Sequence, residues 1–173
     1  MTKEIYSSIL ASKHKGNKQF AILIDPDKMP SADSLSTAIR AGVDYFLIGG
    51  SLLTNGNLHN CIEFVKRSTK IPVILFPGNL LQIDTSADAI LFLSLISGRN
   101  PEMLIGKHVI AAPVLKASKL EVIATGYMLI ESGNQTTVSY MSNTMPIPAD
   151  KDDIAMCTAM AGEMLGIDRK SVV

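Results

Sequence analysis

The chain has 173 residues, of which 47% are hydrophobic and 18% charged, and its formal net charge is zero. This length can bury one substantial core, and the balanced charge offers no basic surface for a nucleic-acid partner. The first residues lack the basic end and apolar run of a signal peptide, and the longest apolar run (89–96) is far shorter than the ~20 residues of a membrane span, so we expect a soluble, cytoplasmic protein.

Short, unbroken apolar runs recur along the chain, and each ends at polar or glycine-rich residues. Continuous apolarity without alternation is typical of parallel strands that are covered on both faces. The runs predict five strands, at 20–24, 45–48, 73–76, 89–93 and 127–130.

Helical patterns lie between the predicted strands. A first helix, 32–41, has Ser31 as its N-cap and ends at Gly42. A second helix, 58–68, places Leu58, Cys61, Ile62 and Val65 on one face.

Two more helices are predicted in the second half of the chain. Pro101 opens one of them, because proline is tolerated in the first helical turn. The other is 151–165, with Asp150 as its cap and Gly166 at its end. Its predicted apolar face consists of Ile154, Cys157, Met160, Ala161, Met164 and Leu165.

The two cysteines, Cys61 and Cys157, both fall in predicted helices and are far apart. We expect both to be small buried hydrophobic residues, not a disulfide or metal ligands.

The alternation of strand and helix, five times over, predicts an α/β protein with right-handed βαβ crossovers. A (β/α)8 barrel and an open doubly wound sheet share this alternation, so periodicity alone leaves both open. The sequence contains no GxGxxG or GxxxxGK[ST] motif and no linker that would mark a second domain.

Three turns are candidates for function, because ligands of parallel α/β proteins bind at the C-terminal ends of the strands. They are Asp25-Pro26-Asp27-Lys28, Gly49-Gly50-Ser51 and Pro77-Gly78-Asn79. A carboxylate and a hydroxyl together are ligands for Mg²⁺, and glycine N–H groups approach phosphate oxygens closely. This predicts a phosphorylated substrate bound with Mg²⁺.

Each turn also has a purely structural interpretation. Asp-Pro-Asp is an ordinary turn in which a carboxylate bonds backbone amides, and Gly-Gly-Ser after a strand serves as a tight turn and helix cap. The occurrence of both after adjacent strands favours the ligand site, but the residues alone do not decide further.

Several segments resemble the successive strand ends of geranylgeranylglyceryl phosphate synthases. They are AILIDPDK (21–28), DYFLIGGS (44–51), PVILFPGN (72–79), TGYMLI (125–130) and SNTMPIP (142–148). They occur in the family's order and at its spacing over nearly the whole chain.

The resemblance implies a (β/α)8 TIM barrel, of which this chain holds about the first five βα units. It implies a prenyltransferase that joins geranylgeranyl diphosphate to the 3-hydroxyl of sn-glycerol 1-phosphate in ether lipid biosynthesis. Mg²⁺ would be held by Asp25 and Ser51, and Gly49 and Gly50 would contact substrate. The prenyl chain would lie in an apolar groove, and a homo-oligomer is possible.

The sequence departs from the family's pattern at its end. The family carries a Tyr-x-Glu-x-Gly-Ser-Gly motif on its sixth strand, with the expected catalytic base, followed by Gly-rich loops for the glycerol phosphate. This chain contains neither. The catalytic residue therefore stays unassigned, and we expect the chain by itself to be inactive.

The last six residues, 168–173, can be encoded by the start of a widely used sequencing adapter. We therefore expect residues 1–167 to be the N-terminal part of one barrel domain and 168–173 to be a non-native tail.

Two alternatives remain at this point. One is another phosphate-binding barrel, such as a sugar-phosphate isomerase or synthase, although Ser51 is a poor base for that chemistry. The other is a non-catalytic half-barrel that binds a partner through its unpaired edge strands.

Overall fold

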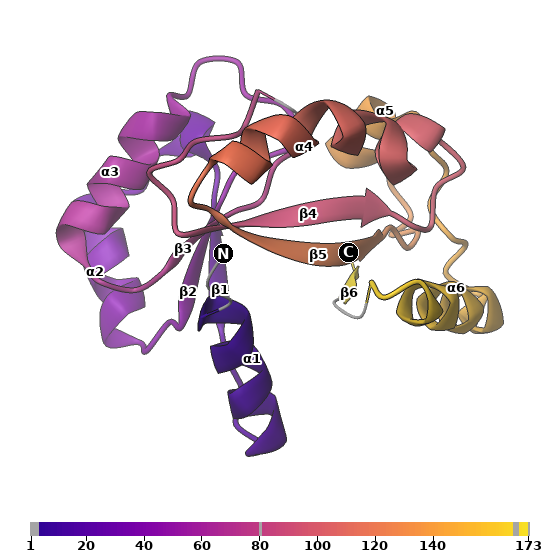
Figure 1. Ribbon diagram of the computed structural model, residues 1–173, viewed down its shortest axis with the longest axis horizontal. Coiled ribbons are helices and arrows are strands. Elements are labelled where there is room, and N and C mark those ends of the chain that lie inside the picture. The colour runs from indigo at the N-terminus through magenta and orange to yellow at the C-terminus, as the bar shows by residue number, and fades with distance from the viewer. Residues whose placement is uncertain (1–3, 80, 168–169, 173) are drawn as a thin grey trace. The chain divides into compact units, whose positions relative to one another are not determined.

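A computed structural model describes residues 4–79, 81–167 and 170–172, without the side chains of 170–172 (Figure 1). The chain forms two compact units. The first comprises residues 1–91 and 115–123, and the second comprises 92–114 and 124–173.

The strands form one sheet in the order β1-β2-β3-β4-β5-β6. Pairing is parallel between β1 and β2, β2 and β3, β3 and β4, and β5 and β6. Sequential parallel strands, most of them joined through helices, confirm the α/β class and match the first units of a barrel. The strands are β1 Ala21–Ile24, β2 Tyr45–Ile48, β3 Val73–Leu75, β4 Ala89–Leu95, β5 Glu121–Met128 and β6 Lys170–Val172.

Helices separate most of these strands along the chain, but the described residues between β3 and β4 form none, so the predicted alternation of strand and helix is wrong at that point. Before β4 they are α1 Glu4–His14, the 3-10 turn η1 Pro26–Lys28, α2 Ala32–Arg40 and α3 Leu58–Ser68. After β4 they are the π-helical turn η2 Glu102–Gly106, α4 Lys107–Ala117, α5 Thr137–Ser142 and α6 Asp152–Met164.

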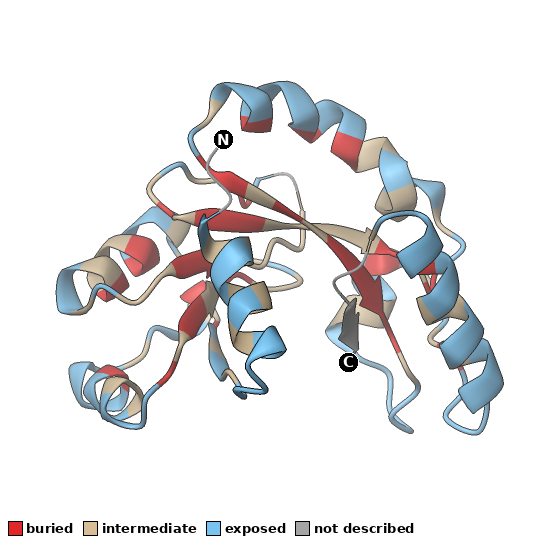
Figure 2. Ribbon diagram, turned by 60° about the horizontal axis from the view of Figure 1, so that its bottom comes forward, coloured by how far each residue is buried: buried red, intermediate tan, exposed pale blue. Residues whose placement is uncertain are grey.

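The core of the first unit lies on the strands, which are the most buried elements in Figure 2. Its centre is a cluster of Tyr45, Ile74, Ala89 and Ile123. Burying an aliphatic side chain contributes about 1.5–3 kcal/mol. Hydrophobic residues of α1, β2 and β4 pack around this centre, namely Ile5, Ile9, Leu47 and Leu91.

Helices α2 and α3 confirm the sequence patterns that predicted them. The Ser31 hydroxyl accepts a hydrogen bond from the Ser34 N–H, and Gly42 takes φ +78° just after α2. Helix α3 buries its predicted face at Cys61, Ile62 and Val65.

Helix α1 was not predicted, because none of its described residues is fully buried and its apolar stripe is weak. Its first turn is held from far along the chain. The buried carboxylate of Glu121 accepts hydrogen bonds from the N–H groups of Ile5 (2.8 Å) and Tyr6 (2.9 Å). A carboxylate at this end also complements the positive end of the helix dipole.

Strand β1 corrects the expectation that both faces of every strand are covered. Ala21 is exposed and Leu23 is 53% exposed, whereas Ile24 is buried. Strand β1 stands at the end of the sheet order and pairs only with β2 among the described strands, so less of it is covered.

Strand β5 corrects the fifth predicted strand, which was placed at 127–130. It begins six residues earlier, at Glu121. Ile130 forms only an isolated bridge to Ile147. The buried polar side chains of Glu121 and Thr125 break the apolar run that the prediction relied on.

Helix α6 starts later than predicted and without the predicted cap. Its N-cap is Lys151, with no side-chain hydrogen bond, so Asp150 does not cap it. Its end is as predicted, because Gly166 takes φ +75° and donates its N–H to the Glu163 carbonyl oxygen at 2.9 Å.

The predicted apolar face of α6 is largely exposed, which contradicts the expectation of burial (Figure 2). Gly162 is the buried residue of this helix, and a Cβ atom there would lie 2.8 Å from Cδ1 of Ile96. Because Gly162 has no side chain, α6 approaches Ile96 closely at this residue, and the larger side chains of α6 point outward. Cys157 is exposed too, so the prediction of burial is right for Cys61 and wrong for Cys157.

Strand β6 was not among the predicted strands and falls in the segment expected to be a non-native tail. It pairs with β5 through Gly126–Lys170, Tyr127–Ser171 and Met128–Val172. Residues 168, 169 and 173 of that tail lie outside the described residues. The origin of the tail stays a prediction.

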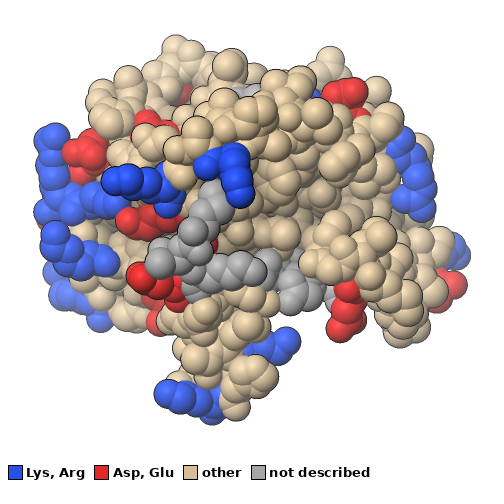
Figure 3. Space-filling view, viewed as in Figure 1, with Lys and Arg blue, Asp and Glu red and all other residues tan. Residues whose placement is uncertain are grey.

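Charged side chains of both signs are interspersed on the face drawn in Figure 3, without a large area of one sign. Within the described ranges, every helix is too short or too polar to cross a bilayer.

Candidate substrate and metal site

Asp25 follows β1 and is the N-cap residue of the turn η1. Its Oδ1 accepts a hydrogen bond from the Asp27 N–H at 3.0 Å, and the buried Pro26 fixes the start of the turn. The Lys28 ammonium lies 3.9 Å from Asp25 Oδ2. Because Lys28 is largely exposed, this ion pair is weak and leaves Asp25 open to a stronger cation.

Asp27 has a different role from Asp25, although both belong to the same turn. Its carboxylate accepts hydrogen bonds from the N–H groups of Thr54 (2.8 Å), Asn55 (3.0 Å) and Gly56, and from the Thr54 hydroxyl (3.0 Å). These bonds, led by the one from the Thr54 amide, outweigh desolvation and lower the pKa of Asp27 to about 2. Asp27 therefore fixes the loop after β2, as the structural interpretation of the turn predicted.

Gly49 is enclosed by backbone on the β3 side. It has φ +151°, and a Cβ atom there would lie 2.1 Å from the Phe76 carbonyl oxygen. Its N–H donates to the Ile24 carbonyl oxygen at 3.1 Å. Only glycine fits this position.

Gly50 lies between Asp25 and the buried side chain of Gln82. A Cβ atom on Gly50 would be 3.6 Å from Asp25 Oδ1, in van der Waals contact. The Gly50 N–H donates to Gln82 Oε1 at 3.2 Å, and the Gly50 carbonyl oxygen accepts from Gln82 Nε2 at 2.7 Å.

The amides of Gly49 and Gly50 are thus already hydrogen-bonded to protein oxygens, at Ile24 and Gln82. They are not free to hold a phosphate in this conformation. The predicted contact of these two residues with substrate stays a prediction, and it requires either a rearrangement or contacts other than these N–H groups.

Ser51 brings a hydroxyl to the same loop and is half-buried. In the part of the chain that the structure describes, no group is hydrogen-bonded to this hydroxyl. Gly78 lies against its backbone, since a Cβ atom on Gly78 would be 2.8 Å from the Ser51 Cα and 2.3 Å from the Gly50 carbonyl oxygen. The loops after β2 and β3 are therefore in close contact.

The oxygen atoms of Asp25 and Ser51 are hard donors that suit Mg²⁺. The described residues contain no group of three or more His, Cys, Asp or Glu that would enclose an ion. Mg²⁺ is usually held by one or two protein ligands, while phosphates and waters complete its coordination. The donor set fits the predicted ion.

The buried thiol of Cys61 in α3 is close enough to Asp25 for the negative charge of Asp25 to affect its pKa. Burial, with a smaller contribution from the negative charge of Asp25, raises the pKa of Cys61 to about 11. Cys61 is therefore a neutral packing residue near the site, not a ligand or nucleophile.

Gln82 is the functional candidate that the sequence did not reveal. It stands between Leu81 and Ile83 in a loop with no motif, and its side chain is 2% exposed. Its role depends on contacts 32 residues away, which no local pattern signals.

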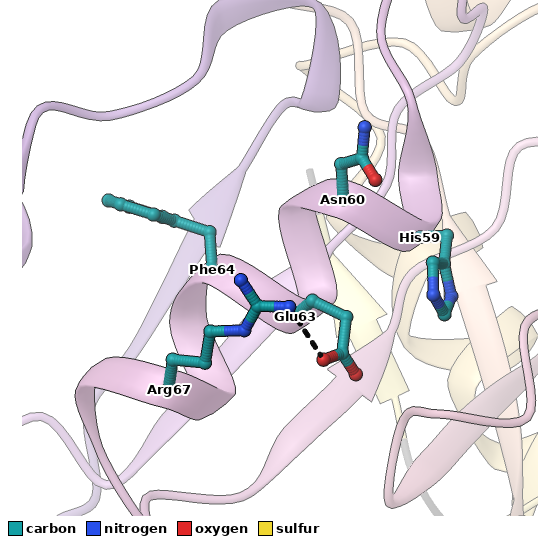
Figure 4. A pocket seen from close by; sticks show the side chains of 5 residues that line it. All are labelled: His59, Asn60, Glu63, Phe64 and Arg67. Atoms are coloured by element: carbon teal, nitrogen blue, oxygen red, sulfur yellow. Dashed lines mark ion pairs between the residues drawn. The ribbon is translucent and has the colours of Figure 1, made fainter.

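A separate hollow of about 240 Å³ lies along α3 (Figure 4). It is lined by His59, Asn60, Glu63, Phe64 and Arg67, with Arg67 paired to Glu63 at 3.6 Å. It contains none of the predicted site residues, so we do not assign it to the site.

The sequential parallel sheet defines an α/β barrel-type protein, and Asp25 and Ser51 lie after the C-terminal ends of β1 and β2, where ligands of such proteins bind. The chain matches the PcrB family over residues 13–169, and it belongs to that family.

Curated relatives of this chain are named geranylgeranylglyceryl phosphate synthase. The relative from Chitinophaga pinensis is 58% identical over 170 residues, covering 96% of this chain and 68% of its own length. That from Spirosoma linguale is 58% identical, covering 90% and 64%. An archaeal relative, from Methanosphaera stadtmanae, is 36% identical, covering 88% and 63%. The chain thus spans about two thirds of the length of these relatives.

Solved structures agree with the family. The (S)-3-O-geranylgeranylglyceryl phosphate synthase from Thermoplasma acidophilum, in complex with substrate sn-glycerol-1-phosphate, matches with a TM-score of 0.88 and 31% identity over 99% of this chain and 70% of that one. Tryptophan synthase subunit alpha from Legionella pneumophila matches with a TM-score of 0.56 at 12% identity, which shows a shared fold alone.

Proposed function

We propose that this chain is the N-terminal part of a prenyltransferase that joins geranylgeranyl diphosphate to the 3-hydroxyl of sn-glycerol 1-phosphate, in ether lipid biosynthesis. One observation carries the proposal: the Asp25 carboxylate lies against Gly50, the residue before Ser51, where the loops after β1 and β2 meet in a chain of the PcrB family. The names of the relatives support the transferase class and the glycerol phosphate acceptor.

Asp25 and Ser51 are the proposed Mg²⁺ ligands. When bound, Mg²⁺ would neutralise the diphosphate as it leaves. Asp25 supplies the negative charge that holds the ion, and the hydrogen bonds of Asp27 to Thr54 and of Gln82 to Gly50 hold the loop that carries Ser51. The base that activates the glycerol hydroxyl is not assigned to any residue of this chain.

We propose in addition that residues 1–173 do not catalyse prenyl transfer on their own. The sequence contains no Tyr-x-Glu-x-Gly-Ser-Gly segment, which in the family carries the expected base. A purified chain that transfers a labelled geranylgeranyl group to sn-glycerol 1-phosphate would contradict this.

The function is therefore tested in a chimera that joins residues 1–167 to the remaining third of the Chitinophaga pinensis relative. The chimera should transfer the labelled prenyl group in a Mg²⁺-dependent manner. Asp25→Asn should lower the rate by ~10³-fold or more, because it removes the charged ligand and keeps the shape. Ser51→Ala should cost less, because a neutral hydroxyl is the weaker ligand.

Ser34→Ala is the matched control, since Ser34 is exposed on α2 and outside the site. It should leave the rate unchanged. A normal rate with Asp25→Asn would remove Asp25 from the metal site, and an active chimera that prefers a sugar phosphate would favour the isomerase alternative.

A further inference from the structure

Gln82 is buried at the point where the loops after β2 and β3 meet. Both polar atoms of its side-chain amide form hydrogen bonds. Oε1 accepts from the N–H groups of Gly50 and Gly78, each at 3.2 Å, and Nε2 donates to the Gly50 carbonyl oxygen at 2.7 Å. One side chain thus binds the Gly50 residue through both its N–H and its C=O, as a neighbouring strand would.

The surroundings give this backbone little room for another position. Gly49 lies against the Phe76 carbonyl oxygen, and Gly78 lies against the Gly50 carbonyl oxygen. Gly50 itself lies against the Asp25 carboxylate. The loop that carries Ser51 is therefore packed between β1 and β3, and Gln82 supplies side-chain hydrogen bonds that tie it to the β3 side.

We propose that Gln82 is a positioning residue, which holds Gly50–Ser51 beside Asp25 so that the carboxylate and the hydroxyl reach one ion. The role rests on the proposed function, because it concerns the same pair of ligands. Gln82 touches neither metal nor substrate in this role and acts through the Gly50 backbone.

The chemistry of the amide makes the role testable through Gln82→Glu. A protonated carboxyl group has one oxygen that accepts and one O–H that donates, so it reproduces the pattern of the glutamine amide. An ionised carboxylate only accepts, and its second oxygen faces the Gly50 carbonyl oxygen. The charged groups in ion pairs on the loops around Gln82 are Asp25 with Lys28, and Asp84 with His59.

The first measurement is hydrogen exchange at the Gly50 and Gly78 amides of the purified chain, relative to the unaltered chain at each pH. Gln82→Met, which has a similar volume but cannot form these bonds, should lose most protection at both amides. Gln82→Glu should be close to the unaltered chain at acid pH and lose protection as its carboxyl group ionises. Gln19→Met is the control, because the Gln19 side chain bonds the Tyr45 hydroxyl at 2.9 Å, at the start of β2, and its replacement should leave both amides protected.

The second measurement is calorimetric binding of inorganic pyrophosphate with Mg²⁺. Gln82→Met should weaken binding by about tenfold or more, as expected for the loss of buried hydrogen bonds. Gln82→Glu should bind nearly as well as the unaltered chain at acid pH and worse at alkaline pH. A glutamine that held the loop without placing the Mg²⁺ ligands would lose protection over the same pH range but keep its pyrophosphate affinity.

Two results would overturn the proposal: unchanged exchange at Gly50 in Gln82→Met, or lost protection with unchanged pyrophosphate affinity. If Gln82→Met does not fold, the pH profile of Gln82→Glu decides. If the unaltered chain does not bind pyrophosphate with Mg²⁺, the metal site and the positioning role are both refuted. This outcome is distinguishable from the other two because it is measured without any variant.

Discussion

Asp25 and Asp27 are two residues apart, yet their surroundings give them separate roles. Asp27 accepts bonds from three consecutive amides and a hydroxyl, so its charge is used within the protein. The Asp25 carboxylate accepts a hydrogen bond from the Asp27 N–H and lies 3.9 Å from the exposed Lys28 ammonium, so its charge is available to a ligand. A pair of carboxylates in a motif is thus no guarantee of a two-carboxylate site.

The low pKa of Asp27 predicts a loop that loosens in acid. The folded pKa of about 2 lies below the ordinary value of 3.8, so the stabilisation is complete above pH 3.8 and is lost as the pH falls toward 2. Asp27→Asn should raise hydrogen exchange at Thr54, Asn55 and Gly56 at neutral pH and abolish this acid dependence. Asp33→Asn, an exposed change on α2, should do neither. Equal exchange in all three proteins would contradict the role of Asp27.

The two cysteines should differ in reactivity. Cys157 is exposed and Cys61 is buried, with its pKa raised to about 11. At pH 8 roughly one Cys61 thiol in a thousand is ionised, so a thiol reagent should modify one cysteine quickly and the second only in denaturant. Cys157→Ser should remove the fast reaction. Fast modification that persists in Cys157→Ser would show that α3 opens readily.

At the scale of elements, the patterns that predicted well are those with a clear inward face. Helices α2 and α3 have such a face, with local caps at Ser31 and Asn57. Helix α6 has its bulky residues on one side, and the structure buries the opposite, smaller side at Gly162. Sequence periodicity predicts that a helix is present more reliably than it predicts which face of the helix is buried.

The glycine after β2 should tolerate no side chain. Gly49→Ala places a Cβ atom 2.1 Å from a backbone oxygen at φ +151°, which should cost more than about 3 kcal/mol of unfolding free energy. Gly42→Ala is a matched control, because φ is +78° with open space around it, and it should cost about 1–2 kcal/mol. Urea unfolding measures both, and similar losses would show that the β2–β3 contact yields easily.

At the scale of the whole molecule, each unit exposes large apolar side chains. Phe20 and Leu23 are 57% and 53% exposed in the first unit, and Met164 and Leu165 are 85% and 76% exposed in the second. Exposed apolar surface of this kind promotes association.

We predict that the purified chain self-associates and that Met160→Lys with Met164→Lys reduces the association without loss of stability. Both methionines are exposed on α6, so their replacement breaks no core. Light scattering after size-exclusion chromatography measures the association, and thermal unfolding measures the stability. Met128→Lys, at a 2% exposed residue of β5, should instead unfold the chain. A double variant as unstable as Met128→Lys would show that α6 is buried in solution.

Much of the fold was predictable because parallel strands keep short, continuous apolar runs. The first four strands were placed to within two residues, and the start of β5 was missed because a buried Glu121 interrupts its run. For the candidate site, the sequence predicted the turns that carry Asp25 and Ser51, and their role as metal ligands stays a prediction. It missed Gln82, because pairing across 32 residues follows from tertiary structure alone.

The hydrogen bonds that the first turn of α1 donates to Glu121 have a consequence for synthesis on the ribosome. The carboxylate that holds its first turn belongs to Glu121, which lies 116 residues after Ile5. At a translation rate of about 5–20 residues per second, roughly 6–23 s pass between the addition of Ile5 and that of Glu121. During that interval the N-terminal segment emerges without its partner, and an isolated helix of this length is marginal in water. The first helix in the sequence is therefore among the last to be secured, and a nascent chain halted before Glu121 should leave this segment open to proteases.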